Sequence, residues 1–117
     1  MSPRQQKYPI LVKSIDDVVI GPKRITKYER ARIIAARAIQ LAMGAPPLID
    51  ISKVEFKDVV TIAEKELEMG ILPMLIKREL PNGEYQLIPV KVFIDVEKKR
   101  NEYIKNLIKN IFGEESE

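Results

Sequence analysis

The sequence predicts an α+β protein: a small helical domain with a C-terminal β-hairpin, preceded by an irregular arm and followed by an extra amphipathic helix. Three patterns predict this class. Residues 26–45 carry the start and stop signals of one helix, residues 73–88 contain two strand-like runs around an Asn-Gly pair, and the tail carries apolar residues at helical spacing. The length of 117 residues is enough for one small domain.

Prolines interrupt the first part of the chain. Pro3, Pro9 and Pro22 separate short apolar pieces, and prolines at this density break regular structure. We expect an irregular arm there, with a short strand at most, that needs a partner to become ordered. The expected organisation is an arm over 1–24, a domain over 25–90 and a C-terminal helical extension over 91–117.

A helix is predicted from about Lys27 to Met43. Thr26 and Glu29 have the spacing of a capping box, and Gly44 fits the left-handed position just past a helix end. At about 100° per residue, four alanines fall within about 60° of one another. Such a stripe permits close approach of another backbone, and the helix carries more apolar surface than a small domain needs. We therefore expect a larger partner to enclose it. The stripe consists of Ala31, Ala35, Ala38 and Ala42.

Three arginines of this helix, Arg30, Arg32 and Arg37, allow two interpretations. They could reach phosphates or guanine edges of a nucleic acid, or they could pair with carboxylates or carbonyls of a partner chain. The connection after Gly44 is long and rich in proline, unlike the short turn of a helix-turn-helix. We favour pairing with a partner protein.

Net charge is unevenly distributed along the sequence. Residues 1–54 hold ten Lys/Arg and four Asp/Glu, a balance of +6, whereas residues 55–117 hold ten and thirteen, a balance of −3. The basic half could face a nucleic acid or an acidic protein surface, or it could simply be solvated. A free-standing small basic DNA-binding protein, using Arg30 and Arg37, is therefore the alternative function.

Further elements follow in order. Residues 48–51 are expected to form a short extended piece, and a second helix is expected from about Lys57 to Met69, with Asp58 at its start and Gly70 after its end. The predicted strands cover 73–79 and 84–88, and Asn82-Gly83 supplies the positive φ angles of a tight turn.

The last predicted element is a helix from about Asp95 to Phe112. Ile104, Leu107, Ile108 and Ile111 follow the i, i+3, i+4, i+7 spacing of one helical face.

The residues that usually carry chemistry are scarce. The absence of Cys and His excludes disulfides, zinc sites built on those residues, thiol nucleophiles and His general bases. Glu64, Glu66 and Glu68 could hold a divalent cation, but Lys65 lies among them, and a solvated face is the favoured interpretation. We expect no catalytic residue, no metal and no cofactor.

The subcellular localisation expected from the sequence is the cytoplasm. No N-terminal stretch resembles a signal peptide, and no apolar run approaches the roughly 20 residues of a membrane span. Ile, Lys and Glu are abundant while Gln, Asn and Cys are scarce, a composition typical of thermophiles.

Two blocks of the sequence resemble one known family. The block TKYERARIIAARAIQLAMGA at 26–45 is similar to the central motif of archaeal DNA-directed RNA polymerase subunit K, which is related to eukaryotic subunit six and bacterial omega. IAEKEL at 62–67, GILP at 70–73 and IKRELPNG at 76–83 match in the same order and spacing. The resemblance covers about 20–90 and leaves the arm and residues 91–117 without an assigned role.

The resemblance implies a non-catalytic subunit of the multisubunit polymerase. Such a subunit holds the C-terminal region of the largest subunit, promotes its assembly, and lies near other subunits at the base of the stalk. The catalytic aspartates and their Mg²⁺ belong to the largest subunit, and DNA is met only indirectly through the complex. The partner-binding residues expected from the resemblance and the alanine stripe are Thr26, Tyr28, Glu29, Ala31, Arg32, Ala35, Arg37, Ala38, Gln40, Ala42, Gly44, Glu66, Pro73, Arg78, Pro81 and Gly83.

Overall fold

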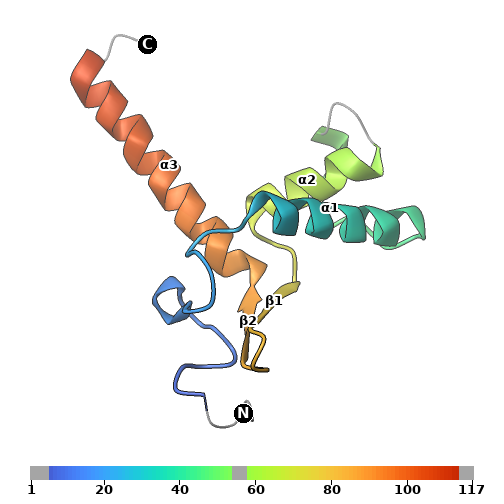
Figure 1. The fold of residues 1–117 in the computed structure, drawn as a ribbon. Coiled ribbons are helices and arrows are strands. Elements are labelled where there is room, and N and C mark those ends of the chain that lie inside the picture. Colours follow the sequence, from blue (N-terminus) through green and yellow to red (C-terminus); the bar gives the residue numbers. More distant parts are fainter. Residues whose placement is uncertain (1–5, 54–57, 114–117) are drawn as a thin grey trace.

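The computed structural model describes residues 6–53 and 58–113. Helices α1 and α2 pack side by side, the hairpin β1–β2 lies below them, and α3 projects away from the body (Figure 1). This arrangement confirms the predicted α+β class. The elements in order are η2 (Ile15–Asp17), α1 (Lys27–Ala42), η3 (Ile51–Lys53), α2 (Val59–Met69), β1 (Leu75–Glu79), β2 (Tyr85–Pro89) and α3 (Val90–Phe112).

The predicted capping box of α1 is present. Thr26 Oγ1 accepts from the Glu29 backbone N–H at 3.1 Å, and the Glu29 carboxylate accepts from the Thr26 backbone N–H at 2.9 Å. Both bonds satisfy donors that have no partner within the helix. The helix ends at Ala42, and Gly44 has φ +107°. The predicted helix is therefore confirmed to within one residue.

The start of α2 is set by Asp58, whose side chain accepts from the Thr61 backbone N–H at 2.8 Å. Gly70 ends the helix in the left-handed conformation, as predicted. The predicted first residue, Lys57, lies outside the described residues.

The extended piece expected over 48–51 is wrong. Leu48 and Ile49 lie in a bend, and the 3-10 turn η3 follows at once. The Leu48 backbone N–H donates to the Glu66 carboxylate rather than to a neighbouring strand. Asp50 accepts from the Ser52 backbone N–H, which favours a local turn.

The predicted hairpin is confirmed, with strands somewhat displaced from the predicted bounds. The strands are antiparallel, and Leu75 lies opposite Pro89 while Glu79 lies opposite Tyr85. At the turn, the Leu80 N–H donates to the Glu84 carbonyl at 2.8 Å, which leaves a three-residue loop over 81–83. The predicted pair of positive φ angles is wrong for Asn82, because only Gly83 has a positive φ, as a three-residue hairpin loop requires.

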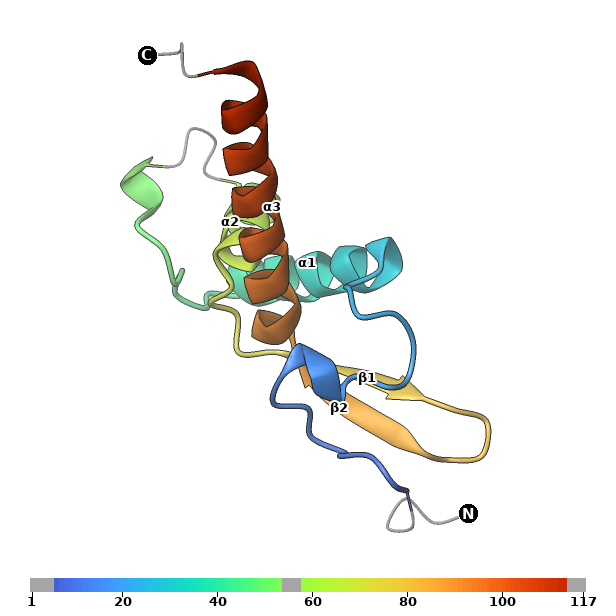
Figure 2. The same cartoon turned by 90° about the vertical axis from the view of Figure 1, so that its left-hand side faces the viewer.

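The N-terminal arm is ordered against its own chain. The Val12 N–H donates to the Leu87 carbonyl at 2.9 Å, and the Leu87 N–H donates to the Ile10 carbonyl at 2.6 Å. Figure 2 shows the arm running along β2. Val18 and Ile20 are buried further along it. For the described part of the arm, the hairpin of the same chain supplies the partner that an arm of this kind usually needs.

Two apolar clusters form the core. The larger one joins all parts of the fold, with the arm, α1, α2, both strands and the start of α3 each contributing at least one side chain. Phe93, Leu67 and Ile88 are its largest fully buried members. The smaller cluster lies between α1 and α2 and consists of Ala38, Leu41, Ile62 and Ala63.

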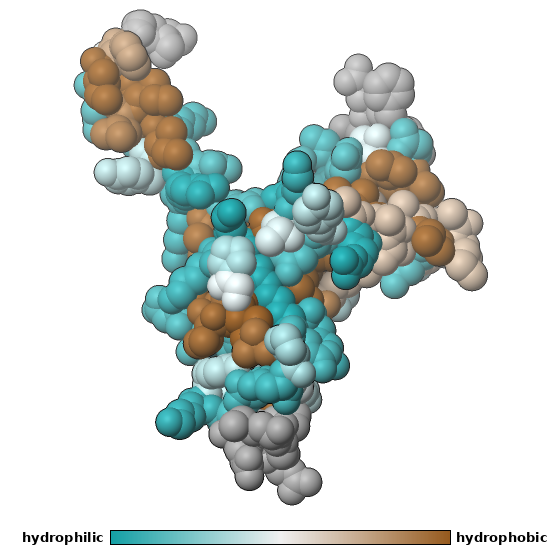
Figure 3. Space-filling model, in the orientation of Figure 1, coloured by the Kyte–Doolittle hydropathy of each residue, from teal (hydrophilic) through white to brown (hydrophobic). Residues whose placement is uncertain are grey.

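Helix α3 begins at Val90, five residues before the predicted start. Val90, Phe93 and Ile94 are buried at i, i+3 and i+4 spacing, so the first turns belong to the core. From Lys98 onward every described residue of α3 is exposed, and Figure 3 shows an apolar patch on this distal half. Among residues 6–53 and 58–113, no helix combines the length and hydropathy of a membrane span.

Candidate protein-binding surface

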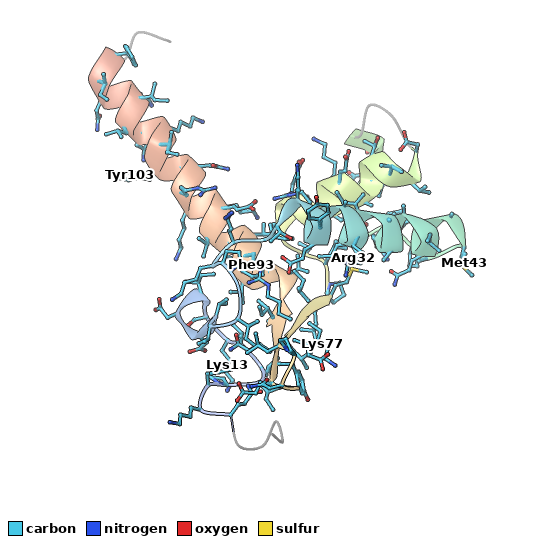
Figure 4. The ribbon with its side chains drawn as sticks, in the orientation of Figure 1. Lys13, Arg32, Met43, Lys77, Phe93 and Tyr103 are labelled. Carbon is cyan, nitrogen blue, oxygen red and sulfur yellow. The ribbon has the colours of Figure 1, made fainter. Side chains whose placement is uncertain are left out.

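One face of α1 is apolar and uncovered. Tyr28, Ile39 and Met43 are 73%, 61% and 81% exposed, and they recur at helical spacing. Ala31, Ala35 and Ala42 are exposed between them. Arg32 is a charged residue within this face, and Figure 4 shows it on α1 with Met43 at the far end. An apolar stripe of this length on a small domain is typical of a protein-binding surface.

The predicted alanine stripe is divided by the structure. Ala35 lies on the exposed face, but Ala38 is buried against Ile62 and Ala63 of α2. Ala38 is thus part of the contact between the two helices of this chain, and the partner-binding role expected for it does not fit its burial.

A buried ion pair fixes α1 to α2. The fully buried Glu66 carboxylate accepts from Arg37 Nε at 2.5 Å and Nη2 at 3.2 Å, and from the Leu48 N–H at 2.7 Å. Arg37 also donates to the Pro46 carbonyl and to Gln40 Oε1. The solvated-face interpretation is therefore wrong for Glu66, although Glu64 and Glu68 on the same helix are exposed as expected.

Arg78 fixes β1 to α1 and to the arm. Its Nε and Nη2 each donate to one oxygen of Glu29 at 2.9 Å, a bidentate pair. Nη1 and Nη2 also reach the carbonyls of Ile20, Pro22 and Arg24 at 2.6–2.9 Å. The guanidinium lies 4.9 Å from the centre of the Phe93 ring. This single side chain therefore joins the arm, α1, β1 and α3.

A single nitrogen of Arg30, Nη2, donates to both carboxylate oxygens of Glu97 in α3, at 2.8 and 2.9 Å. The expected pairing of Arg30 and Arg37 with a partner chain is not what the structure has, because both side chains pair with carboxylates of this chain. Arg32 differs, because no carboxylate in the described residues pairs with it.

A cleft of about 420 Å³ separates the first turns of α1 from β1. Arg32 and Lys77 bring positive charge to it from the two sides, while the Glu29 carboxylate is occupied by Arg78. The cleft adjoins the exposed face of α1, because Tyr28 and Arg32 belong to both. Its lining residues are Thr26, Tyr28, Glu29, Arg32, Leu75, Ile76 and Lys77.

The sequence that forms this surface is similar to that of known proteins. A family model described as RNA polymerase Rpb6 matches residues 20–74, which contain α1, α2 and the cleft residues up to the start of β1. DNA-directed RNA polymerase subunit Rpo6 of Sulfurisphaera tokodaii is 59% identical over 68 residues, which cover 58% of this chain and 79% of that relative. The chain belongs to the Rpb6 family of RNA polymerase subunits.

Other Rpb6-family relatives agree. Subunit Rpo6 of Thermofilum pendens is 54% identical over 72 residues, covering 62% of this chain and 88% of the relative. Subunit Rpo6 of Pyrobaculum aerophilum is 47% identical over 89 residues, covering 76% and 84%. The resemblance predicted from the two sequence blocks is confirmed. Helix α3 lies outside the part that the Rpb6 model matches.

The remaining residues expected to bind a partner lie at a second cleft, in the hairpin turn and near the end of α1. Pro73 lines a second cleft of about 590 Å³ beside the start of β1. Pro81 and Gly83 lie in the hairpin turn, and Gly83 has φ +94°. Gly44 ends α1, and Gln40 supports Arg37. Gly44, Gly83 and Gln40 therefore have evident structural roles within this Rpb6-family fold.

Gln86 is a structural residue that the sequence reasoning missed. Its fully buried amide oxygen accepts from the Val19 and Ile20 N–H groups, and its nitrogen donates to the carbonyls of Pro9 and Asp17. It lies at an inward position of β2, next to the buried Ile88. A polar residue at an inward strand position was the available signal, because such a residue needs internal partners.

We expect stability to depend on the ionisation of Glu29. Burial acts to raise the pKa of this carboxyl, but hydrogen bonds from Arg78 and from the Thr26 backbone outweigh burial, so the pKa lies below its ordinary value of 4.5. Because the folded state favours the carboxylate, this contribution is complete above about pH 4.5 and is lost as pH falls through the lowered pKa. Urea unfolding of wild type and Glu29→Gln from pH 7 to pH 3 measures it. The stability difference between them should shrink on acidification, and a constant difference would contradict the assignment.

Proposed function

We propose that this Rpb6-family chain is a non-catalytic subunit of an archaeal DNA-directed RNA polymerase that holds the C-terminal region of the largest subunit and promotes assembly of the enzyme. The observation that carries the proposal is the exposed apolar face of α1 beside the cleft at β1. The subunit would work without a cofactor, and it would meet DNA only indirectly, through the complex. Other polymerase subunits near the base of the stalk would be its further neighbours.

The internal ion pairs support a rigid binding surface. Arg37–Glu66 fixes α1 to α2, Arg78–Glu29 fixes it to β1, and Arg30–Glu97 fixes it to α3. A surface held from three sides loses little conformational entropy when it binds. The largest-subunit segment loses freedom on docking, and a partner that binds only its folded form stabilises that form.

In the alternative function, a free-standing DNA-binding protein, Arg30 and Arg37 would contact DNA, and both side chains already have partners within the chain. Arg30 and Arg37, the two side chains named for it, are engaged with Glu97 and Glu66. Phosphate contacts require cations that are free to displace counterions. The polymerase-subunit proposal is therefore favoured.

The size of the native complex tests this function. A tagged full-length chain expressed in its natural host should elute from a gel-filtration column together with the largest polymerase subunit. Elution as a stable monomer, with no largest subunit in its fractions, would overturn the proposal.

Two alanine substitutions on α1 should affect different properties, one the association with a partner and the other the stability of the chain. Ala35→Leu adds bulk to the exposed face and should leave the unfolding free energy of the isolated chain within about 0.5 kcal/mol. It should weaken association by about 1–3 kcal/mol if a partner packs closely there. Ala38→Leu should instead destabilise the isolated chain by about 1–3 kcal/mol, because Ala38 is packed against α2.

Competition between wild-type and Ala35→Leu chains for incorporation into the polymerase measures the loss of association. Urea unfolding of the isolated chains measures the stability of both variants. Equal incorporation of wild type and Ala35→Leu would show that the alanines of this face do not contact the partner.

A further inference from the structure

Strand β1 has an outer edge with unused backbone groups. In an antiparallel pair, hydrogen-bonded and non-hydrogen-bonded residue pairs alternate. The Val90 N–H donates to the Met74 carbonyl and the Leu80 N–H to the Glu84 carbonyl, so the even-numbered residues of β1 face β2. The N–H and C=O groups of Leu75, Lys77 and Glu79 therefore point away from β2.

The other edge of the hairpin is already covered. Leu87 lies opposite Lys77 and uses its outward N–H and C=O groups to bind Ile10 and Val12 of the arm. No backbone hydrogen bond from any part of residues 6–53 and 58–113 reaches the corresponding outward groups of β1. Within the described residues the chain thus covers one edge and leaves on the other a row of N–H and C=O groups that can pair with another chain.

The open edge adjoins empty space. The 420 Å³ cleft lies between Leu75–Lys77 and the first turns of α1. Leu75 also lines the 590 Å³ cleft formed with Met69, Ile71 and Pro73. Leu75 at the start of β1 therefore lines both clefts.

We propose that β1 binds an extended segment of the largest polymerase subunit as an added strand, hydrogen-bonded to Leu75, Lys77 and Glu79. This inference rests on the proposed function and specifies how the partner is held. Only an extended backbone matches a row of alternating N–H and C=O groups at strand spacing. The exposed face of α1 would then pack against residues that flank the added strand.

The clefts define the side chains of that segment. Arg32 and Lys77 place two cations at the first cleft, and Arg32 lacks a carboxylate partner within the described chain. An Asp or Glu of the added strand meets these cations. At the second cleft, Met69, Ile71 and Leu72 receive apolar side chains. The segment is therefore extended, acidic at one end and apolar at the other.

Residue-resolved amide hydrogen exchange, measured on the free full-length chain and on the purified polymerase containing it, tests the added strand. In the free chain the Ile76 and Arg78 amides should be protected and the Lys77 and Glu79 amides should exchange quickly. In the polymerase, protection of Lys77 and Glu79 should rise by about 100-fold or more, so that the four consecutive amides from Ile76 to Glu79 are all protected.

Fast exchange at Lys77 and Glu79 in a polymerase that retains the chain would overturn the added strand while leaving the proposed function intact. Loss of the chain from the polymerase would instead overturn the proposed function. A uniform rise across 75–79, without the selective gain at odd-numbered positions, would show stabilisation of the hairpin only and would also overturn the added strand.

A matched pair of substitutions gives a second test. Lys77→Pro removes the outward N–H but no hydrogen bond to β2, and proline is tolerated on edge strands in this orientation. Lys77→Ala removes the same side chain and keeps the N–H. Incorporation into the polymerase, in competition with wild type, should fall by about tenfold for Lys77→Pro and by less than about threefold for Lys77→Ala.

Equal incorporation of the two variants would count against the added strand. Circular dichroism and urea unfolding of each variant verify that the hairpin remains folded. Glu79→Pro, which removes another outward N–H, replaces Lys77→Pro if the latter is unfolded.

Discussion

Replacing Glu66 with alanine is expected to lower the free energy of unfolding by about 3–5 kcal/mol. The substitution leaves the Arg37 guanidinium buried between α1 and α2 without its counter-charge, and it removes the acceptor of the Leu48 N–H. A buried charge without a partner costs far more than the intact pair contributes, because the guanidinium has lost its hydration. The loss should also disturb the orientation of α1, and with it the exposed face that we propose binds the partner.

Urea unfolding of the full-length chain at pH 7 measures this effect. Glu64→Ala and Glu68→Ala are matched controls on the same helix, since both side chains are exposed, and each should change stability by no more than about 0.5 kcal/mol. Arg37→Met combined with Glu66→Leu should recover part of the loss, because neither charge then remains buried. A Glu66→Ala variant as stable as Glu64→Ala would contradict the buried pair.

Arg78→Met is expected to cost about 3 kcal/mol, the second-largest effect. The variant loses the bidentate pair with Glu29 and the donors to the carbonyls of Ile20, Pro22 and Arg24. The Glu29 carboxylate is partly exposed and can regain water, so the expected loss is smaller than for Glu66. The arm should detach from the hairpin first, because three of the lost hydrogen bonds are accepted by its backbone carbonyls.

Lys77→Met is the matched control for this change. Lys77 is the neighbouring residue of β1, carries the same charge and points to the exposed face, so its replacement should cost about 0.5 kcal/mol at most. The stability loss of Arg78→Lys should lie between those of Arg78→Met and Lys77→Met, because a single ammonium group cannot bind the carboxylate and three carbonyls at once. If Arg78→Met and Lys77→Met are equally stable in urea, the network around Arg78 contributes nothing measurable.

The element boundaries that local chemistry controls could be predicted. The Thr26–Glu29 capping box and the glycines after α1 and α2 act within a few residues of chain, and the structure has each of them. A turn at Asn82-Gly83 is also present, although only Gly83 has the predicted positive φ. The start of α3 could not be placed in the same way. Val90, Phe93 and Ile94 follow β2 without a break, and a short apolar run there fits either a strand or a helix.

The candidate surface was predicted only in part, because helical periodicity does not say which face the chain itself covers. The spacing placed the four alanines of α1 in one stripe, but α2 buries Ala38 through a contact with Ala63 while the other three stay exposed. The roles of Arg37 and Arg78 depend on partners 29 and 49 residues away in sequence. Such pairs arise from tertiary packing, which no local pattern contains. On the exposed face of α1, the predicted residues that the structure leaves accessible are Tyr28, Ala31, Arg32, Ala35 and Ala42.

Site-specific photo-cross-linking from position 39 tests the central claim most directly, because Ile39 is a large apolar side chain of the exposed face of α1 and is itself 61% exposed. A photo-reactive amino acid is introduced there in the full-length chain, and position 64 on the exposed side of α2 carries the same group as a control. After irradiation of the purified polymerase, position 39 is expected to form a cross-link to the C-terminal region of the largest subunit at a yield well above that from position 64. A yield no higher than the control, or a cross-link to a different subunit, would contradict the assignment of this face as the surface that holds the largest subunit.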